Sequence, residues 1–169
     1  MCFIKRIGKN IPKPQIAKRD IVVYKYTKSY GSSFCCDNTK FLSLIYNFKY
    51  ITNKKSKKIP LTPRLSTLFE IYPWLRNSSN YHTNDCPVIS INKGYHSYMS
   101  LNRVKEDILD DSPIYTPGVK QVYEFDIFNY YIGEFVIPKG SEYYKNHMGE
   151  IVSSCLMYTG KFEIFNPLI

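Results

Sequence analysis

The sequence predicts an α+β fold made mostly of antiparallel β-sheets, with a few short helices. The chain has 169 residues, enough for one domain that buries about two thirds of the surface of its unfolded chain. Its sixteen Tyr and ten Phe favour strands over helices. In the last third of the chain, short apolar runs alternate with turn residues, a pattern typical of an antiparallel meander.

The N-terminal part predicts an arm followed by a central strand. Residues 1–19 are expected to form a basic extended arm, because Pro12 and Pro14 are incompatible with a helix there. Residues 20–169 are expected to form a single α+β domain. Within it, IVVYKY at 21–26 is the first clear strand, and its apolar first half predicts cover on both faces and a place inside a sheet.

The middle of the chain alternates between strand, loop and helix signals. Residues 41–51 alternate in polarity and favour a strand, with a helix as the alternative. The lysine-rich segment 53–64 contains two prolines and predicts an exposed loop. Residues 65–72 place apolar side chains at helical spacing and predict a short helix that ends at Pro73. Residues 86–91 predict another short strand.

A second helix is expected just after residue 100. Ser100 is a suitable N-cap, because its hydroxyl can accept from an unpaired backbone N–H of the first turn. The apolar residues that follow lie on one helical face. From there to the C-terminus the pattern is strand after strand, over residues 119–128, 132–137, 141–144, 150–158 and 161–165. Thr159-Gly160 is expected to be a turn between the last two.

The positive charge is concentrated in the first part of the chain. Residues 1–64 carry fifteen Lys and Arg against two acidic residues, a formal charge of +13, whereas residues 65–169 carry −4. This polarity predicts an anionic partner, either nucleic acid, anionic lipid or an acidic protein. The alternative is a solvated basic surface that serves solubility. The candidate partner-binding residues are Lys5, Arg6, Lys9, Lys54, Lys55, Lys57 and Lys58.

The sequence lacks the motifs of metal-binding, membrane-spanning and secreted proteins. The five cysteines show no Cys-x-x-Cys spacing and no paired-histidine spacing, so we expect no metal site. No apolar run approaches the roughly 18 residues that span a bilayer, and residues 1–10 lack the apolar core of a secretory signal. We therefore expect a cytoplasmic protein with reduced thiols, and the sequence leaves its oligomeric state open.

Three segments resemble the signature strands of ADP-ribosyltransferases of the arginine, serine-threonine-serine, glutamate type. They are VVYKY at 22–26, INKGYHSYMSLNRVKED at 91–107 and YIGEFVIPKGSEYY at 131–144. The resemblance implies a split-sheet, ADP-ribosyltransferase-like fold and NAD as the cofactor. Such enzymes cleave the nicotinamide-ribose bond and need a carboxylate to stabilise developing positive charge.

The resemblance also implies site residues. Glu134 matches the catalytic glutamate, Ser97 lies in the segment that matches serine-threonine-serine, and Lys25 stands in place of the arginine. Lys25 offers a point charge in place of a planar fork, and Ile132 stands where the family has its first acid. The complete candidate set is Glu134, Ser97 and His96 for catalysis, and Lys25, Tyr26 and Tyr95 for the cofactor.

The chain is also similar to a set of uncharacterised small proteins from phages and mobile elements of Bacteroidota. The shared segments are AKRDIVVYK at 17–25, GYHSY at 94–98, VIPKGSEYY at 136–144 and EIVS at 150–153. This resemblance implies the host bacterial cytoplasm as the location, with the virion as an alternative. Two functions follow as hypotheses. The first is a non-enzymatic phage or mobile-element binding protein that uses a basic N-terminal surface, in host takeover, defence antagonism or the virion. The alternative is an active or degenerate NAD-dependent ADP-ribosyltransferase with Glu134 as the catalytic acid.

Overall fold

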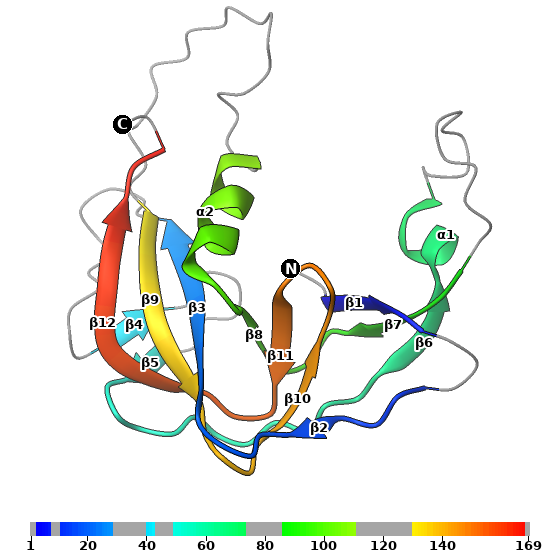
Figure 1. The fold of residues 1–169 in the computed structure, drawn as a ribbon, viewed down its shortest axis with the longest axis horizontal. Helices are drawn as coiled ribbons and strands as arrows, with labels where there is room; N and C mark the ends of the chain where they lie inside the picture. The colour runs from blue at the N-terminus through cyan, green and yellow to red at the C-terminus, as the bar shows by residue number, and fades with distance from the viewer. Residues whose placement is uncertain are drawn as a thin grey trace, which may run out of the picture.

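The fold was analysed in a computed structural model of the chain (Figure 1). The structure describes residues 3–7, 11–28, 40–42, 49–73, 86–110 and 130–167. The strand expected at 119–128 lies outside these ranges.

Three antiparallel sheets and two helices make up the described part of the chain (Figure 1). The largest sheet has seven strands in the order β12-β9-β3-β8-β11-β10-β2. Its strands are β2 (Gln15–Ile16), β3 (Ile21–Lys28), β8 (Tyr95–Tyr98), β9 (Tyr130–Ile137), β10 (Glu142–Lys145), β11 (Glu150–Ser153) and β12 (Met157–Phe165). The other elements are β1 (Phe3–Arg6), β7 (Pro87–Ile91) and β6 (Arg64–Thr67) in a second sheet, β4 (Lys40–Leu42) and β5 (Lys49–Ile51) in a third, and the helices α1 (Leu68–Ile71) and α2 (Leu101–Asp110). The predicted α+β class is confirmed.

Strand β3 lies inside the large sheet, as its apolar sequence predicts. It pairs with β9 along its whole length and meets β8 at one pair of residues, Tyr24 and Tyr98. Because side chains alternate along a strand, Val23 and Lys25 leave β3 on one face, and Tyr24 leaves it on the other. The strand therefore separates two apolar cores.

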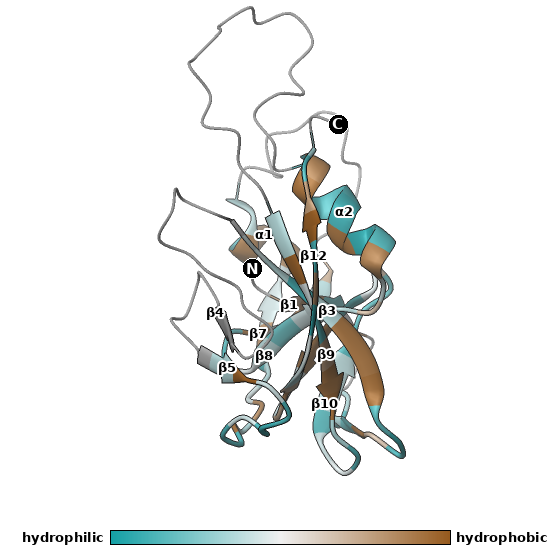
Figure 2. Cartoon of the chain, turned by 90° about the vertical axis from the view of Figure 1, so that its left-hand side faces the viewer, coloured by the Kyte–Doolittle hydropathy of each residue, from teal (hydrophilic) through white to brown (hydrophobic). Residues whose placement is uncertain are grey.

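The two cores differ in what covers them. On the Tyr50 face, defined by the side chains that pack around Tyr50, Phe135 stacks edge-on against the Tyr50 ring with centroids 4.9 Å apart. On the α2 face, the helix buries Val104 and Ile108 against Ile132 of β9 and its neighbours. Figure 2 shows α2 over one end of the sheet only, so the remainder of that face is not covered by this helix.

The helix α2 begins as predicted, with the Arg103 N–H donating to the Ser100 hydroxyl (3.2 Å). The other helix is shorter than predicted. Residues 64–67 form β6 and pair with β7, where Leu65 lies opposite Ile89. The helical spacing of residues 65–72 was therefore overridden by pairing with β7, and the helix starts only after the N-cap Thr67.

Two loop expectations have different outcomes. Residues 53–63 carry exposed lysines and lie outside the strands of the sheets, as predicted. Their backbone is nevertheless fixed, because the Asn53 N–H donates to the Tyr158 carbonyl (2.8 Å) and the Ile59 N–H to that of Ser154 (2.8 Å). The turn predicted at Thr159-Gly160 is wrong: these residues lie within β12, where the register against β9 shifts. Gly160 has a φ of +86°, which suits a bulge.

The described parts of the first nineteen residues are extended, and they are docked on the sheets. Phe3 of β1 is buried against β7. Strand β2 pairs with β10 at the end of the large sheet, with Ile16 opposite Glu142. The two pieces thus lie in different sheets (Figure 1).

Candidate functional site

The three segments that resemble the transferase signature lie on adjacent strands, β9, β3 and β8. Their key side chains do not share a face. Lys25 lies opposite Gly133 in the β3–β9 ladder, and Glu134 lies opposite Tyr24. Because directly opposed residues project to the same side and successive residues alternate, Lys25 projects to the Tyr50 face and Glu134 to the α2 face.

Lys25 occupies the point where β3 and β8 diverge after a single paired position. Its Nζ donates to the His96 carbonyl and lies 5.9 Å from the centroid of the Tyr50 ring. The lysine therefore satisfies a carbonyl at a place where the ladder of backbone hydrogen bonds is interrupted. Burial lowers the pKa of the Lys25 ammonium from 10.5 to about 8, because the charged form is disfavoured away from water.

His96 and Ser97 project to opposite faces of β8. Ser97 lies on the Tyr50 face and is buried, and its hydroxyl has no hydrogen-bond partner within the described ranges. His96 lies opposite Val152 of β11. Burial lowers the pKa of His96 from 6.5 to about 4, and the charge of Lys25 acts in the same direction. His96 is therefore neutral at pH 7.

Glu134 lines a shallow pocket of about 210 Å³ on the α2 face. Its Oε1 lies 3.3 Å from the Nζ of Lys161, a mostly exposed lysine on β12. Tyr24 and Leu101 line the same pocket. A lysine thus already pairs with the carboxylate that the resemblance assigns to catalysis.

The two candidate tyrosines are also on different faces. The Tyr26 hydroxyl donates to Asp107 of α2 (3.0 Å), whereas the Tyr95 hydroxyl donates to the Lys57 carbonyl (2.6 Å). Burial raises the pKa of Tyr95. The six transferase candidates are therefore divided between the two sides of the sheet.

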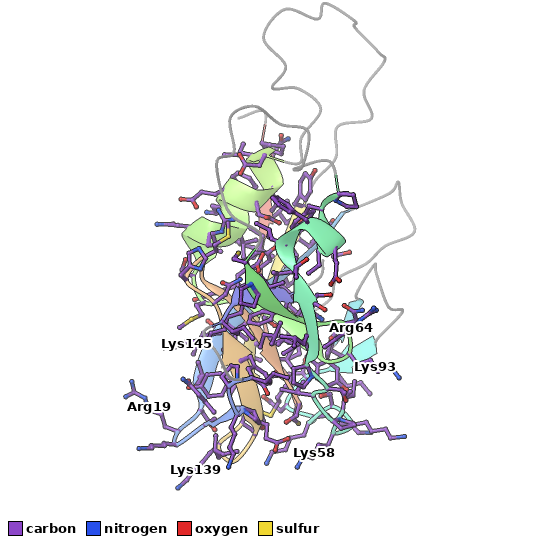
Figure 3. The ribbon with its side chains drawn as sticks, turned by 90° about the vertical axis from the view of Figure 1, so that its right-hand side faces the viewer. Arg19, Lys58, Arg64, Lys93, Lys139 and Lys145 are labelled. Atoms are coloured by element: carbon purple, nitrogen blue, oxygen red, sulfur yellow. The ribbon has the colours of Figure 1, made fainter. Side chains whose placement is uncertain are left out.

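A second group of functional side chains gathers at one end of the molecule. We call this group the basic end, and Figure 3 shows three of its members along the lower edge. Three segments between strands, residues 17–20, 56–59 and 138–141, bring it together. The Ala17 N–H donates to the Ser141 carbonyl (2.9 Å), the Ser154 N–H to that of Glu142 (2.9 Å), and the Ile59 N–H to that of Ser154 (2.8 Å). The basic end consists of Lys18, Arg19, Lys57, Lys58 and Lys139.

The cations of the basic end outnumber the acidic residues of the same segments. All five side chains are exposed, and none of them forms an ion pair with another described residue. Asp20 is the single acidic residue in the segments 17–20, 56–59 and 138–141. Its Oδ1 accepts from the backbone N–H of Lys139 (2.8 Å). Five cations against this one acid leave a formal charge of +4 on the three segments.

The basic end overlaps only in part with the residues singled out in the sequence. Lys57 and Lys58 belong to it, and Lys54 and Lys55 are exposed just before them on the same segment. Lys5 lies on β1, in the second sheet. The side chain of Arg6 and all of Lys9 lie outside what the structure describes.

Lys18, Arg19 and Lys139 were missed. The sequence offers one indication of them, which is that they lie in turns. Lys18 and Arg19 lie between two strands, and Lys139 lies in a Pro-Lys-Gly turn. Turn residues are exposed, but the sequence does not show which turns meet.

An open groove of about 800 Å³ lies beside the basic end. Its apolar lining includes two exposed aliphatic side chains, Ile16 with 53% of its surface accessible and Val22 with 47%. Lys18 and Arg19 line the same groove. It is therefore both apolar and cationic.

Neither a metal site nor a membrane-spanning helix is found in the described part of the chain. Among the described residues, no group of three or more His, Cys, Asp and Glu side chains is placed to hold a metal ion. None of the described helices has the length and apolar character needed to cross a membrane. Comparison of the chain with protein-family models, with curated proteins and with solved structures found no match.

Proposed function

We propose that the protein is a non-enzymatic binding protein whose basic end binds the phosphate backbone of nucleic acid. The observation that carries this proposal is the gathering of five exposed cations from three separate segments, none of which forms an ion pair with another residue that the structure describes. Surface cations that lack acidic neighbours create a positive potential that attracts a polyanion. The phosphate groups of a nucleic acid can be bound by lysine side chains that act as point charges.

The proposed binding is independent of base sequence. Four of the five cations are lysines, which contact phosphate as point charges, and Arg19 is the one side chain with a planar fork. They lie on segments between strands, and neither described helix contributes to the basic end. Contacts of this kind position a protein on the backbone without reading the bases.

The setting of this function stays a prediction. Host takeover, defence antagonism and a virion role are all compatible with a small nucleic-acid-binding protein of phage or mobile-element origin. The NAD-dependent ADP-ribosyltransferase also stays an alternative prediction. The placement of Lys25 and Glu134 on opposite faces of β3 and β9 favours the binding function over it.

The test is a titration of a fluorescent DNA duplex of about twenty base pairs, followed by anisotropy at about 100 mM salt. The variant Lys57→Gln/Lys58→Gln is expected to bind more weakly than the wild type by about tenfold or more. The control is Lys105→Gln/Lys161→Gln, which removes the same charge from two lysines that pair with Glu163 and Glu134. If both double variants lose the same affinity for the duplex, net charge alone explains the loss, and a local binding surface is contradicted.

A further inference from the structure

The groove beside the basic end leaves two aliphatic side chains in solvent at one place. Ile16 comes from β2, at the edge of the sheet, and Val22 comes from the start of β3. Single exposed apolar residues are ordinary on a protein surface. These two line one groove of about 800 Å³ together with the half-buried Tyr143. An apolar groove of this kind is a candidate binding surface.

Helix α2 lies on the same face of the sheet as this groove but at the other end. Val22 lies opposite Val136 in the β3–β9 ladder, on the same face as Tyr24. Helix α2 packs on the other end of that face, against Tyr24, Tyr26 and Ile132. Figure 1 shows α2 at the end of the sheet opposite the turns that carry the basic end.

The charges that line the groove indicate which class of ligand it can bind. Lys18 and Arg19 line it beside the aliphatic side chains. The one acidic lining residue, Asp20, accepts the backbone N–H of Lys139. A nucleotide has the complementary pair of features, an anionic phosphate joined to a flat base with an apolar face. The guanidinium of Arg19 is itself planar and can stack on a base.

We propose that this groove takes an unstacked nucleobase while the basic end holds the neighbouring phosphates, so that the protein prefers single-stranded to duplex nucleic acid. This inference rests on the proposed function and adds a substrate class to it. In a duplex the faces of the bases are covered by stacking, and exposing one costs free energy. A single strand presents its bases without most of that cost.

The experiment compares three fluorescent probes by anisotropy. They are an oligothymidylate of about twelve nucleotides, an abasic strand of the same length, and a duplex of the same length. The abasic strand keeps every phosphate and removes every base. The wild type is expected to bind the oligothymidylate about tenfold more tightly than the abasic strand, because base stacking on a protein surface has this order of effect.

The variant Ile16→Thr/Val22→Thr removes apolar surface while keeping β-branched side chains in the strands. It is expected to bind the two single strands within about twofold of each other and to keep its duplex affinity. Ile164→Thr is the matched control, because Ile164 is equally exposed, on β12, and this variant should behave as the wild type. Thermal melts verify that each variant is folded.

The outcomes separate this inference from the function on which it rests. Equal, salt-dependent binding of the oligothymidylate and the abasic strand by the wild type would overturn the nucleobase groove and leave the basic end intact. Absence of salt-dependent binding to all three probes would overturn both. A synthetic peptide of alternating Glu and Leu is the fourth probe. If it binds more tightly than the oligothymidylate and loses that advantage in Ile16→Thr/Val22→Thr, the groove belongs to an acidic protein partner and the nucleobase assignment is overturned.

Discussion

Lys25 and Glu134 are one position out of register on neighbouring strands, with Lys25 opposite Gly133 and Glu134 opposite Tyr24. Their side chains consequently leave the sheet on opposite faces. Lys25 binds the His96 carbonyl, and Glu134 pairs with Lys161. Each group thus has a local structural role.

Asp107 is expected to fasten α2 to the sheet. Its Oδ2 accepts hydrogen bonds from Tyr98 (2.5 Å) and Tyr26 (3.0 Å). Hydrogen bonds to a charged group contribute about 1.5–3 kcal/mol each to stability, so Asp107→Ala should lower the free energy of unfolding by about 2 kcal/mol or more. Urea denaturation measures this. Asp110→Ala, at the exposed end of the same helix, should change stability little, and an equal loss there would contradict the role of Asp107.

Any side chain at Gly94 is expected to destabilise the protein, because a Cβ has no room there and the backbone φ is positive. With φ at +144°, an added Cβ would lie 2.6 Å from Val152 Cγ2 and 2.8 Å from Leu61 Cδ2. Gly140 also has a positive φ, of +86°, but a Cβ there would meet nothing within 4 Å. Gly94→Ala should therefore destabilise the protein more than Gly140→Ala, by about 1–3 kcal/mol for the overpacking. Equal melting temperatures for the two variants would contradict the tight contact.

The buried His96 should make the protein less stable in mild acid. Its pKa is about 4 in the folded protein against the ordinary histidine value of 6.5, so between these pH values the unfolded chain binds more protons than the folded protein. Stability therefore falls as the pH drops from 6.5 to 4, by up to about 3 kcal/mol from this residue. His96→Gln should flatten this part of the stability profile, whereas the exposed His147→Gln should leave it unchanged. An unaltered slope in His96→Gln would show that other groups cause the acid sensitivity.

The buried Lys25 should make the stability of the protein depend on pH in the alkaline range. Its pKa is about 8 in the folded protein, against the ordinary lysine value of 10.5. Between these pH values the unfolded chain therefore retains a proton that the folded protein has lost. Stability attributable to Lys25 therefore rises between pH 8 and 10.5. Lys25→Met should remove this rise when its unfolding profile is compared with that of the wild type. If the two profiles run parallel, the amine is solvated and the buried assignment is wrong.

Local patterns predicted much of the fold, because they depend on neighbouring residues. The apolar run of β3 and the Ser100 N-cap of α2 are examples. Residues 65–67 were predicted wrongly because their pairing with β7, more than twenty residues away, outweighs their helical spacing. Gly160 marks a bulge and was taken for a turn, since a glycine suits either.

The candidate site was less predictable for a physical reason. The identity of Lys25 and Glu134 is visible in the sequence, but the face to which each projects depends on the register of β3 against β9, and a shift of one residue reverses it. The basic end depends on contacts between turns far apart in the chain, such as Asp20 with Lys139. Net charge predicted that a basic surface exists without placing it.

The salt dependence of duplex DNA binding tests the central claim most directly. If the five cations of the basic end each neutralise a phosphate, log Kobs should fall with log salt with a slope of about −4.5, and Lys57→Gln/Lys58→Gln should reduce its magnitude by about 1.8. The measurement covers about 50 to 200 mM salt. A slope near zero for the wild type, or the same slope in the wild type and the double variant, would contradict the assignment of nucleic-acid binding to the basic end.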